Sequence, residues 1–336
     1  MPAARATPTH IRAVLMLVLA NVFWGLSFPL IKAIAFEHQQ LLPASSSWFI
    51  TACMLAPRFL LATAILLVWR RRALRGLSRP EIRQGVGLAL FAIVGMVFQN
   101  DGLQYTSAST SAFLTQVYAI LIPLWLALRQ RRLPPATVWV SCALVLAGAA
   151  VLAKVDWREL HLGRGEIETL LSSLFFMGEI LLLDRTDFAG NRPVPVTLLM
   201  FIVEAAASLV MIGATAPRLA DVPVLFTSAP WVGFTVALTL FCTVGAFTIM
   251  NTWQPRITAT EAGLIYCLEP LFASFMALFL PGIFSVFAGF TYPNETLTGN
   301  LLIGGGLITA ANVLIQLKPP ARSAAPAPLA PGKDGE

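Results

Sequence analysis

Long apolar stretches alternate with short polar segments along almost the entire chain. A helix that spans a membrane needs about 20 predominantly apolar residues, because each residue advances it by only about 1.5 Å. The chain contains ten stretches of this kind, so the pattern predicts ten membrane-spanning helices. We place them at residues 12–34, 48–69, 83–103, 107–128, 135–154, 165–184, 195–213, 229–253, 258–280 and 298–317.

The composition agrees with this pattern. Of the 336 residues, 57% are hydrophobic and 12% are charged, whereas a soluble domain carries about 25% charged residues. These values exclude a soluble globular protein and a disordered chain. The four cysteines all lie in apolar stretches without metal or disulfide spacing, and no catalytic or cofactor motif is present. We therefore expect no enzyme activity, no metal and no cofactor.

Basic residues are distributed unevenly between the predicted loops. With the N-terminus in the cytoplasm, 17 of the 23 Lys and Arg residues lie in cytoplasmic segments and 4 in outer ones. Because basic residues are retained on the cytoplasmic side, this predicts an all-α multi-pass protein of the cell inner (plasma) membrane with both termini inside. It also explains the net charge of +6 without nucleic acid as a partner. The Pro- and Ala-rich residues 319–336 are predicted to form a disordered cytoplasmic tail.

Weak internal repetition relates the two halves of the chain. Asn100 and Asn251 lie 151 residues apart, and several neighbouring motifs repeat at the same spacing. The repetition predicts two five-helix domains, at residues 12–154 and 163–318. Since five is an odd number, the second domain has the inverted orientation in the membrane. Inverted repeats are characteristic of secondary transporters, whose substrate sites lie near the membrane midplane.

Five motifs, taken in order, resemble those of one family. They are NVFWGLSF at 21–28 followed by Lys32, RFLLA at 58–62, GLQYTSA at 102–108 followed by Pro123, YCLEPL at 266–271 and ETLT at 295–298. Their order and spacing resemble the EamA-like family of the drug/metabolite transporter superfamily. The resemblance implies ten helices and transport of small metabolites, often outward across the bacterial inner membrane. Residues 281–294 depart from the family by their length and Phe content, and we expect an interfacial lid or an extended helix there.

Ionisable side chains inside a membrane cost about 2.5–3.5 kcal/mol at a helix centre, so they indicate either a function or a partner. Glu269, next to helix-disturbing Pro270, could bind a cationic group or pass a coupling proton; the alternative is a carboxyl group bonded to nearby backbone. Arg58 and Glu204 are predicted to be structural, either as a charge pair or through hydrogen bonds to backbone carbonyl groups. The predicted substrate-binding residues lie within the spans: Trp24, Asn100, Gln116, Tyr118, Glu179, Asn251, Tyr266 and Glu269. The two asparagines could equally bridge helices, and Trp24 could simply pack in the core.

The predicted function is secondary active transport, by alternating access, of a small metabolite such as an amino acid. Export and proton coupling through Glu269 are hypotheses, and the expected partners are the small-molecule substrate, the lipid bilayer and protons, for a monomer or a homodimer. A sugar-phosphate or nucleotide-sugar antiporter would need several cations in its cavity, yet only Lys32 and Arg58 lie within spans. A channel or receptor, the other alternative, would not require a duplicated, inverted unit.

Overall fold

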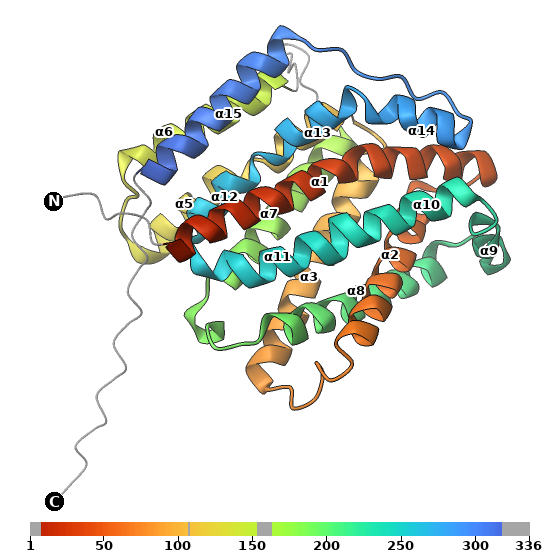
Figure 1. Cartoon of the computed structure of the whole chain (residues 1–336), viewed down its shortest axis with the longest axis horizontal. Helices are drawn as coiled ribbons and strands as arrows, with labels where there is room; N and C mark the ends of the chain where they lie inside the picture. Colours follow the sequence, from red (N-terminus) through yellow and green to blue (C-terminus); the bar gives the residue numbers. More distant parts are fainter. Residues whose placement is uncertain (1–7, 107, 153–162, 318–336) are drawn as a thin grey trace, which may run out of the picture.

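The computed structural model describes residues 8–106, 108–152 and 163–317, which form helices and no strand (Figure 1). The predicted tail, residues 319–336, lies outside this part of the chain. The α-helices are α1 (Pro8–Leu41), α2 (Ser47–Trp69), α3 (Arg79–Gly102), α4 (Ala108–Thr115), α5 (Tyr118–Gln130), α6 (Ala136–Leu152), α7 (Arg164–Leu183), α8 (Pro193–Thr215), α9 (Val222–Leu225), α10 (Ala229–Ala237), α11 (Ala246–Trp253), α12 (Ala259–Tyr266), α13 (Glu269–Ala277), α14 (Leu280–Ala288) and α15 (Gly299–Leu317). A π-helical stretch (Leu238–Gly245) joins α10 to α11, and short 3-10 turns occur at Thr186–Phe188, Leu219–Asp221 and Gln254–Arg256.

Polar caps determine where several helices begin. The Ser78 hydroxyl accepts a hydrogen bond from the backbone N–H of Glu81 (3.3 Å), and the Glu81 carboxylate accepts one from the N–H of Ser78 (2.8 Å). This reciprocal capping box starts α3 at Arg79 rather than at the predicted residue 83. α1 also extends beyond its predicted limits of 12–34, so that Lys32 lies inside the helix and not at its end.

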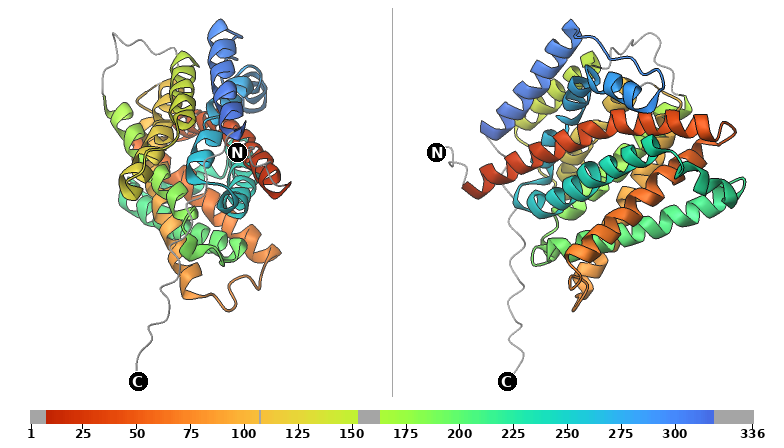
Figure 2. Two further views of the ribbon diagram at one scale, coloured as in Figure 1. Left: turned by 90° about the vertical axis from the view of Figure 1, so that its left-hand side faces the viewer. Right: turned by 45° about the vertical axis from the view of Figure 1, so that its right-hand side comes forward.

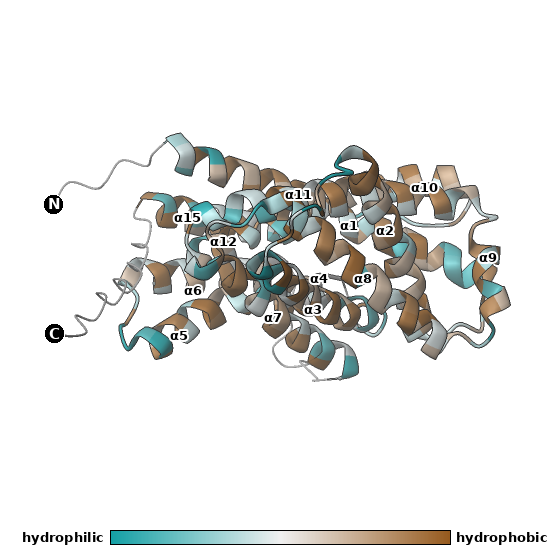
Figure 3. Cartoon of the chain, turned by 90° about the horizontal axis from the view of Figure 1, so that it is seen from below, coloured by the Kyte–Doolittle hydropathy of each residue, from teal (hydrophilic) through white to brown (hydrophobic). Residues whose placement is uncertain are grey.

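Seven helices or helix runs of the described residues are long and apolar enough to cross a membrane. The run α12–α13 and the helix α14 are bent by 57° relative to each other. If they are counted together as one span, the number of candidate spans is eight. α6 has only 17 residues, and α7 carries Glu166, Glu168 and Glu179, so neither meets the usual length and composition of a span. The count of ten spans therefore stays a prediction. Figure 3 shows hydrophobic residues along most of the helices. Many large apolar side chains among them are exposed, and this is the surface that lipid would cover.

Two helix breaks occur at equivalent positions of the two halves. α4 ends at Thr115 and α5 begins at Tyr118, whereas α12 ends at Tyr266 and α13 begins at Glu269. Both pairs of positions are 151 residues apart, which is the spacing found in the sequence. A helix end leaves backbone N–H and C=O groups without intrahelical partners. At both breaks tight backbone turns supply such partners: the N–H of Gln116 donates to Phe113 (3.1 Å), and the N–H of Cys267 donates to Leu264 (3.2 Å).

Helices of the first half pack mainly against helices of the second. α2 lies on α8, α3 on α7, and α1 on both α11 and α13, while α6 and α15 form a pair at one edge of the molecule (Figures 1 and 2). Glycines permit the closest approaches: a Cβ on Gly25 of α1 would lie 2.6 Å from Cβ of Phe272 on α13. The central cavity consequently has walls from both halves.

Candidate functional site

A central cavity of about 80 Å³ lies between the two halves. Its walls come from α1, α2, α3, α4, α5, α7, α11, α12 and α13. Six of the eight predicted substrate-binding residues line it, namely Trp24, Asn100, Tyr118, Glu179, Tyr266 and Glu269. Arg58, predicted as a structural residue, lines it as well. The helix breaks place Tyr118 and Glu269 on the cavity wall, since each is the first residue of its helix.

The remaining two predicted residues do not line the cavity. Gln116 is buried, and its Oε1 has no hydrogen-bond partner among the described residues. Asn251 donates from Nδ2 to Oγ1 of Thr197 (2.9 Å) and so bridges α11 and α8. For Asn251 the structure therefore has the bridging arrangement, while Asn100, its counterpart in the first half, lines the cavity.

Two carboxyl groups face the cavity from different helices. Glu179 on α7 is 4% exposed, and its Oε1 has no partner among the residues that the structure describes. Glu269 is half-buried at the N-terminus of α13, where the helix dipole favours a negative charge. A buried carboxyl oxygen without a partner is costly. Such a group in a cavity wall is a strong candidate for binding a ligand or a proton.

Arg58 supplies a positive charge to the same cavity. Its Nε donates to Oγ1 of Thr243 (2.5 Å), and its Nη2 donates to the carbonyl oxygen of Cys242 (3.4 Å). Both acceptors belong to the π-helical stretch, and π-helical turns occur frequently at functional sites. The predicted ion pair with Glu204 is not formed within 4.0 Å among the described residues, and both Glu204 carboxyl oxygens are buried without a partner there.

Aromatic rings form much of the remaining wall. Trp24 meets the ring of Tyr266 at 5.3 Å and that of Phe247 at 5.7 Å, both edge to face. The residues that the sequence did not predict include Gln99, Thr115, Phe176 and Phe247 in the cavity wall, and Gln254 beside it. The sequence could have indicated Gln99, because it directly precedes Asn100. It could not have indicated Phe176 and Phe247, because apolar residues of a span are common and nothing distinguishes these two.

Gln254 closes one side of the central cavity. The Tyr266 hydroxyl donates to Oε1 of Gln254 (2.8 Å), and Nε2 of Gln254 donates to the carbonyl oxygen of Ile180 (2.8 Å). We call this buried group the inner barrier, because it lies toward the end of the molecule at which α1 begins. Beyond it is an inner cavity with Arg185 and Arg256 in its wall, and the two cavities share no lining residue among those described.

The central cavity borders a third cavity toward the opposite, outer end of the molecule. Ile31 and Asn100 line both. The wall of this outer cavity comes mainly from the second half of α1, the end of α3, α13, and the residues after α14. In this structure the central cavity therefore adjoins the outer cavity, whereas the inner barrier lies between it and the inner cavity.

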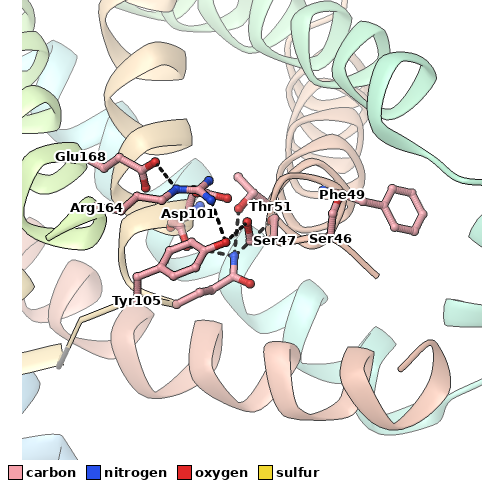
Figure 4. A network of polar contacts seen from close by, with 10 residues as sticks. Ser46, Ser47, Phe49, Thr51, Asp101, Tyr105, Arg164 and Glu168 are labelled. Atoms are coloured by element: carbon pink, nitrogen blue, oxygen red, sulfur yellow. Dashed lines mark hydrogen bonds and ion pairs between the residues drawn. The ribbon is translucent and has the colours of Figure 1, made fainter. Parts of the chain in front are cut away.

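A polar network joins α2, α3 and α7 at the outer end (Figure 4). Arg164 donates to Asp101 (2.5 Å), to Glu168 (2.8 Å) and to the hydroxyl of Tyr105 (2.8 Å), which in turn meets the hydroxyl of Ser47 (2.9 Å). The guanidinium group also lies 4.2 Å from the centre of the Tyr105 ring. Residues from both halves are thereby held together beside the outer cavity. Among the described residues no group of His, Cys, Asp and Glu could hold a metal ion.

Long apolar helices around a polar-lined cavity define a multi-pass helical membrane protein. Residues 11–154 match the model of the EamA-like transporter family, which confirms the predicted resemblance. Over 309 residues the chain is 25% identical to an uncharacterized transporter of Archaeoglobus fulgidus. The match covers 90% of this chain and 85% of that protein. A crystal structure of another protein superposes with a TM-score of 0.63 over 91% of this chain and 97% of its own; at 20% identity it supports the fold alone. The first half of the chain is thus similar to the EamA-like transporter family, and the long apolar helices are those of a multi-pass membrane protein.

Proposed function

We propose that the protein is a secondary active transporter of a small metabolite such as an amino acid, acting by alternating access. The central cavity carries this proposal, because its wall has charges of both signs and it lies between the outer cavity and the inner barrier. Arg58 can bind a carboxylate, while Glu179 and Glu269 can bind an ammonium group. A carrier of zwitterions needs both kinds of partner within reach of one bound molecule.

The proposed architecture has ten spans in two inverted halves, 12–154 and 163–318, with both termini in the cytoplasm. Two observations support the halves: the helix breaks at equivalent positions, and the packing of α2 on α8 and of α6 on α15. In a molecule with inverted halves, these pairs join equivalent helices. The distribution of basic residues supports the orientation and an inner-membrane location.

Coupling is proposed to occur at Glu269. Its carboxyl group lies in the cavity wall and can meet either a proton or the ammonium group of the substrate. If the two compete, the inward movement of protons would drive export of the substrate. The antiporter of sugar phosphates is disfavoured, because one arginine faces two carboxyl groups in this cavity.

Counterflow in proteoliposomes tests the function. Vesicles that contain the purified protein and unlabelled phenylalanine should take up labelled phenylalanine in a saturable manner. Glu269→Gln should lower this rate and flatten its pH dependence. The control is Asp187→Asn, since Asp187 is an exposed carboxylate, paired with Arg185 outside the central cavity, and it should leave both unchanged.

Three results would count against the proposal. An unchanged rate and pH profile in Glu269→Gln would remove that residue from the mechanism. Flux that rises linearly with concentration and is not stimulated by unlabelled phenylalanine would indicate a channel. Absence of flux for every amino acid would refute the proposed substrate class.

A further inference from the structure

The outer cavity contains a second group of charged and aromatic side chains. Lys32 comes from α1, and Tyr292 and Glu295 come from the segment after α14. The Lys32 ammonium nitrogen lies 5.8 Å from the centre of the Tyr292 ring, a cation–π distance. Tyr292 lies in residues 281–294, where the sequence departs from the EamA-like pattern, whereas Lys32 and Glu295 lie in motifs that resemble it.

The segment after α14 is held in place by its own hydrogen bonds. The backbone N–H of Tyr292 donates to the Ser285 hydroxyl (2.8 Å), and that hydroxyl donates to the Tyr292 carbonyl oxygen (2.9 Å). The N–H of Glu295 donates to the carbonyl oxygen of Ala277 at the end of α13 (2.8 Å). Tyr292 also meets the ring of Phe36 on α1 at 5.5 Å. The positions of Tyr292 and Glu295 are therefore fixed relative to α1 before any ligand arrives.

The two charged groups of the outer cavity remain available. Lys32 and Glu295 are both exposed, and neither forms an ion pair with a residue that the structure describes. Burial and the nearby Glu295 raise the pKa of the Tyr292 phenol, so its hydroxyl stays neutral and able to donate. One wall thus presents a cation, and the neighbouring wall presents a carboxylate and a hydroxyl.

The outer cavity repeats the chemistry of the central one. Each combines one basic side chain, at least one carboxylate and aromatic rings, and the two cavities meet at Ile31 and Asn100. Lys32 follows Trp24 by eight residues on α1, which corresponds to about 12 Å along the helix. A solute that leaves the central cavity by this route passes Lys32 and Glu295.

We propose that the outer cavity is a second binding site for zwitterionic solutes, in which Lys32 binds the carboxylate and Glu295 the ammonium group. Tyr292 lies between them and packs its ring against the solute. This inference rests on the proposed function, because it assigns to the outer site the same class of solute as to the central one. It adds a separate binding step on the path between the central cavity and the outer side.

Binding of three molecules with the same ring and different charges tests the site. Phenylalanine is a zwitterion, phenethylamine a cation and 3-phenylpropionate an anion. Equilibrium binding of labelled phenylalanine to the purified protein should saturate at two molecules per chain. In the double variant Lys32→Gln/Glu295→Gln one of the two molecules should bind about 4- to 25-fold more weakly, because both charges of the outer site are lost while the central cavity is unaltered.

The single variants should change selectivity in opposite directions. An ion pair with a partly exposed side chain is worth only about a two- to fivefold change in affinity. Lys32→Gln should weaken the binding of phenylalanine and 3-phenylpropionate at the outer site by this factor. It should leave the binding of phenethylamine unchanged. Glu295→Gln should weaken the binding of phenylalanine and phenethylamine and leave the binding of 3-phenylpropionate unchanged. The matched controls Arg218→Gln and Asp221→Asn remove one charge of each sign from an exposed loop outside the cavities and should change none of the three.

Several outcomes would overturn the outer site. One bound phenylalanine per chain in the wild type, or equal weakening of all three ligands in both variants, would show that Lys32 and Glu295 do not form it. One bound phenylalanine together with saturable counterflow would refute the outer site and leave the proposed function intact. Two bound phenylalanines without any flux would refute the carrier function and leave the outer site intact.

Discussion

Individual polar side chains give this membrane protein its chemistry, and they are partnered very unequally. Arg58 and Tyr266 are held by specific hydrogen bonds, whereas Glu179 and Glu204 have buried carboxyl oxygens without partners among the described residues. Partnered groups have fixed positions and can form walls and barriers. Groups without partners in a cavity wall are free to exchange protons or ligands. Tyr266 belongs to the first kind and Glu179 to the second.

Removal of the Tyr266 hydroxyl should weaken the inner barrier. In Tyr266→Phe the Oε1 of Gln254 would stay buried and lose its partner, which costs about 1–2 kcal/mol of unfolding free energy. We expect a lower melting temperature of the purified protein in detergent. Tyr118→Phe is the matched control, since Tyr118 is also buried and its hydroxyl has no hydrogen bond among the described residues. Equal melting temperatures for the two variants would show that the inner barrier contributes nothing to stability.

Contacts between helices determine the shape of the central cavity, and α1 meets α13 closely beside it. Gly25 allows this approach because it has no side chain; the backbone N of Ala273 would lie 2.9 Å from a Cβ there. Trp24 and Glu269 belong to the same two helices and line the cavity. A change in the separation of α1 and α13 would therefore displace Trp24 and Glu269 directly.

Gly25→Ala should push α1 away from α13. The backbone of α13 cannot rotate aside as a side chain could, so we expect a loss of about 1–3 kcal/mol of stability, as for other overpacked sites. Counterflow should fall with it, because Trp24 and Glu269 would be displaced. Gly306→Ala is the control: a Cβ there meets nothing within 4 Å, and alanine favours a helix more than glycine does. A Gly25→Ala protein with wild-type stability and flux would refute the tight contact.

The inner barrier lies between the central cavity and one end of the molecule, and the orientation in the membrane decides which compartment each cavity meets. Arg12 lies over the ring of Trp253, so the start of α1 and the end of α11 share the inner end. The inner cavity with Arg185 and Arg256 lies at this end, while Lys32 and Glu295 line the cavity at the other. The distribution of basic residues predicts that the inner end faces the cytoplasm.

Cysteine labelling from each side tests this orientation. Leu133 lies 86% exposed in the loop after α5, and Leu219 lies 64% exposed between α8 and α9. In intact cells a membrane-impermeant maleimide should label Leu219→Cys, and it should label Leu133→Cys only after lysis. The four native cysteines are buried and should give little background. Labelling of Leu133→Cys in intact cells would contradict the predicted orientation.

Local sequence was sufficient for features that depend on local physics. Long apolar stretches predicted the helices, and Ser78 with Glu81 explains the start of α3. Glu269 was predicted because an ionisable side chain within a membrane costs free energy and therefore indicates a function or a partner. Trp24, Asn100, Tyr118, Glu179 and Tyr266 were also predicted for the site, and all of them line the central cavity.

Tertiary structure decided what depends on neighbours distant in sequence. Hydropathy says how deep a residue lies but not toward which neighbour it points, so Gln116 and Asn251 were assigned to a cavity that they do not line. The expected pairing of Arg58 with Glu204 is replaced by bonds to a π-helical stretch, which no periodicity in the sequence indicated. Lys32 and Glu295, 263 residues apart in the sequence, share a cavity only because the segment after α14 folds back onto α1. Such pairs depend on the packing of whole helices, and that packing is set by contacts summed over the entire chain.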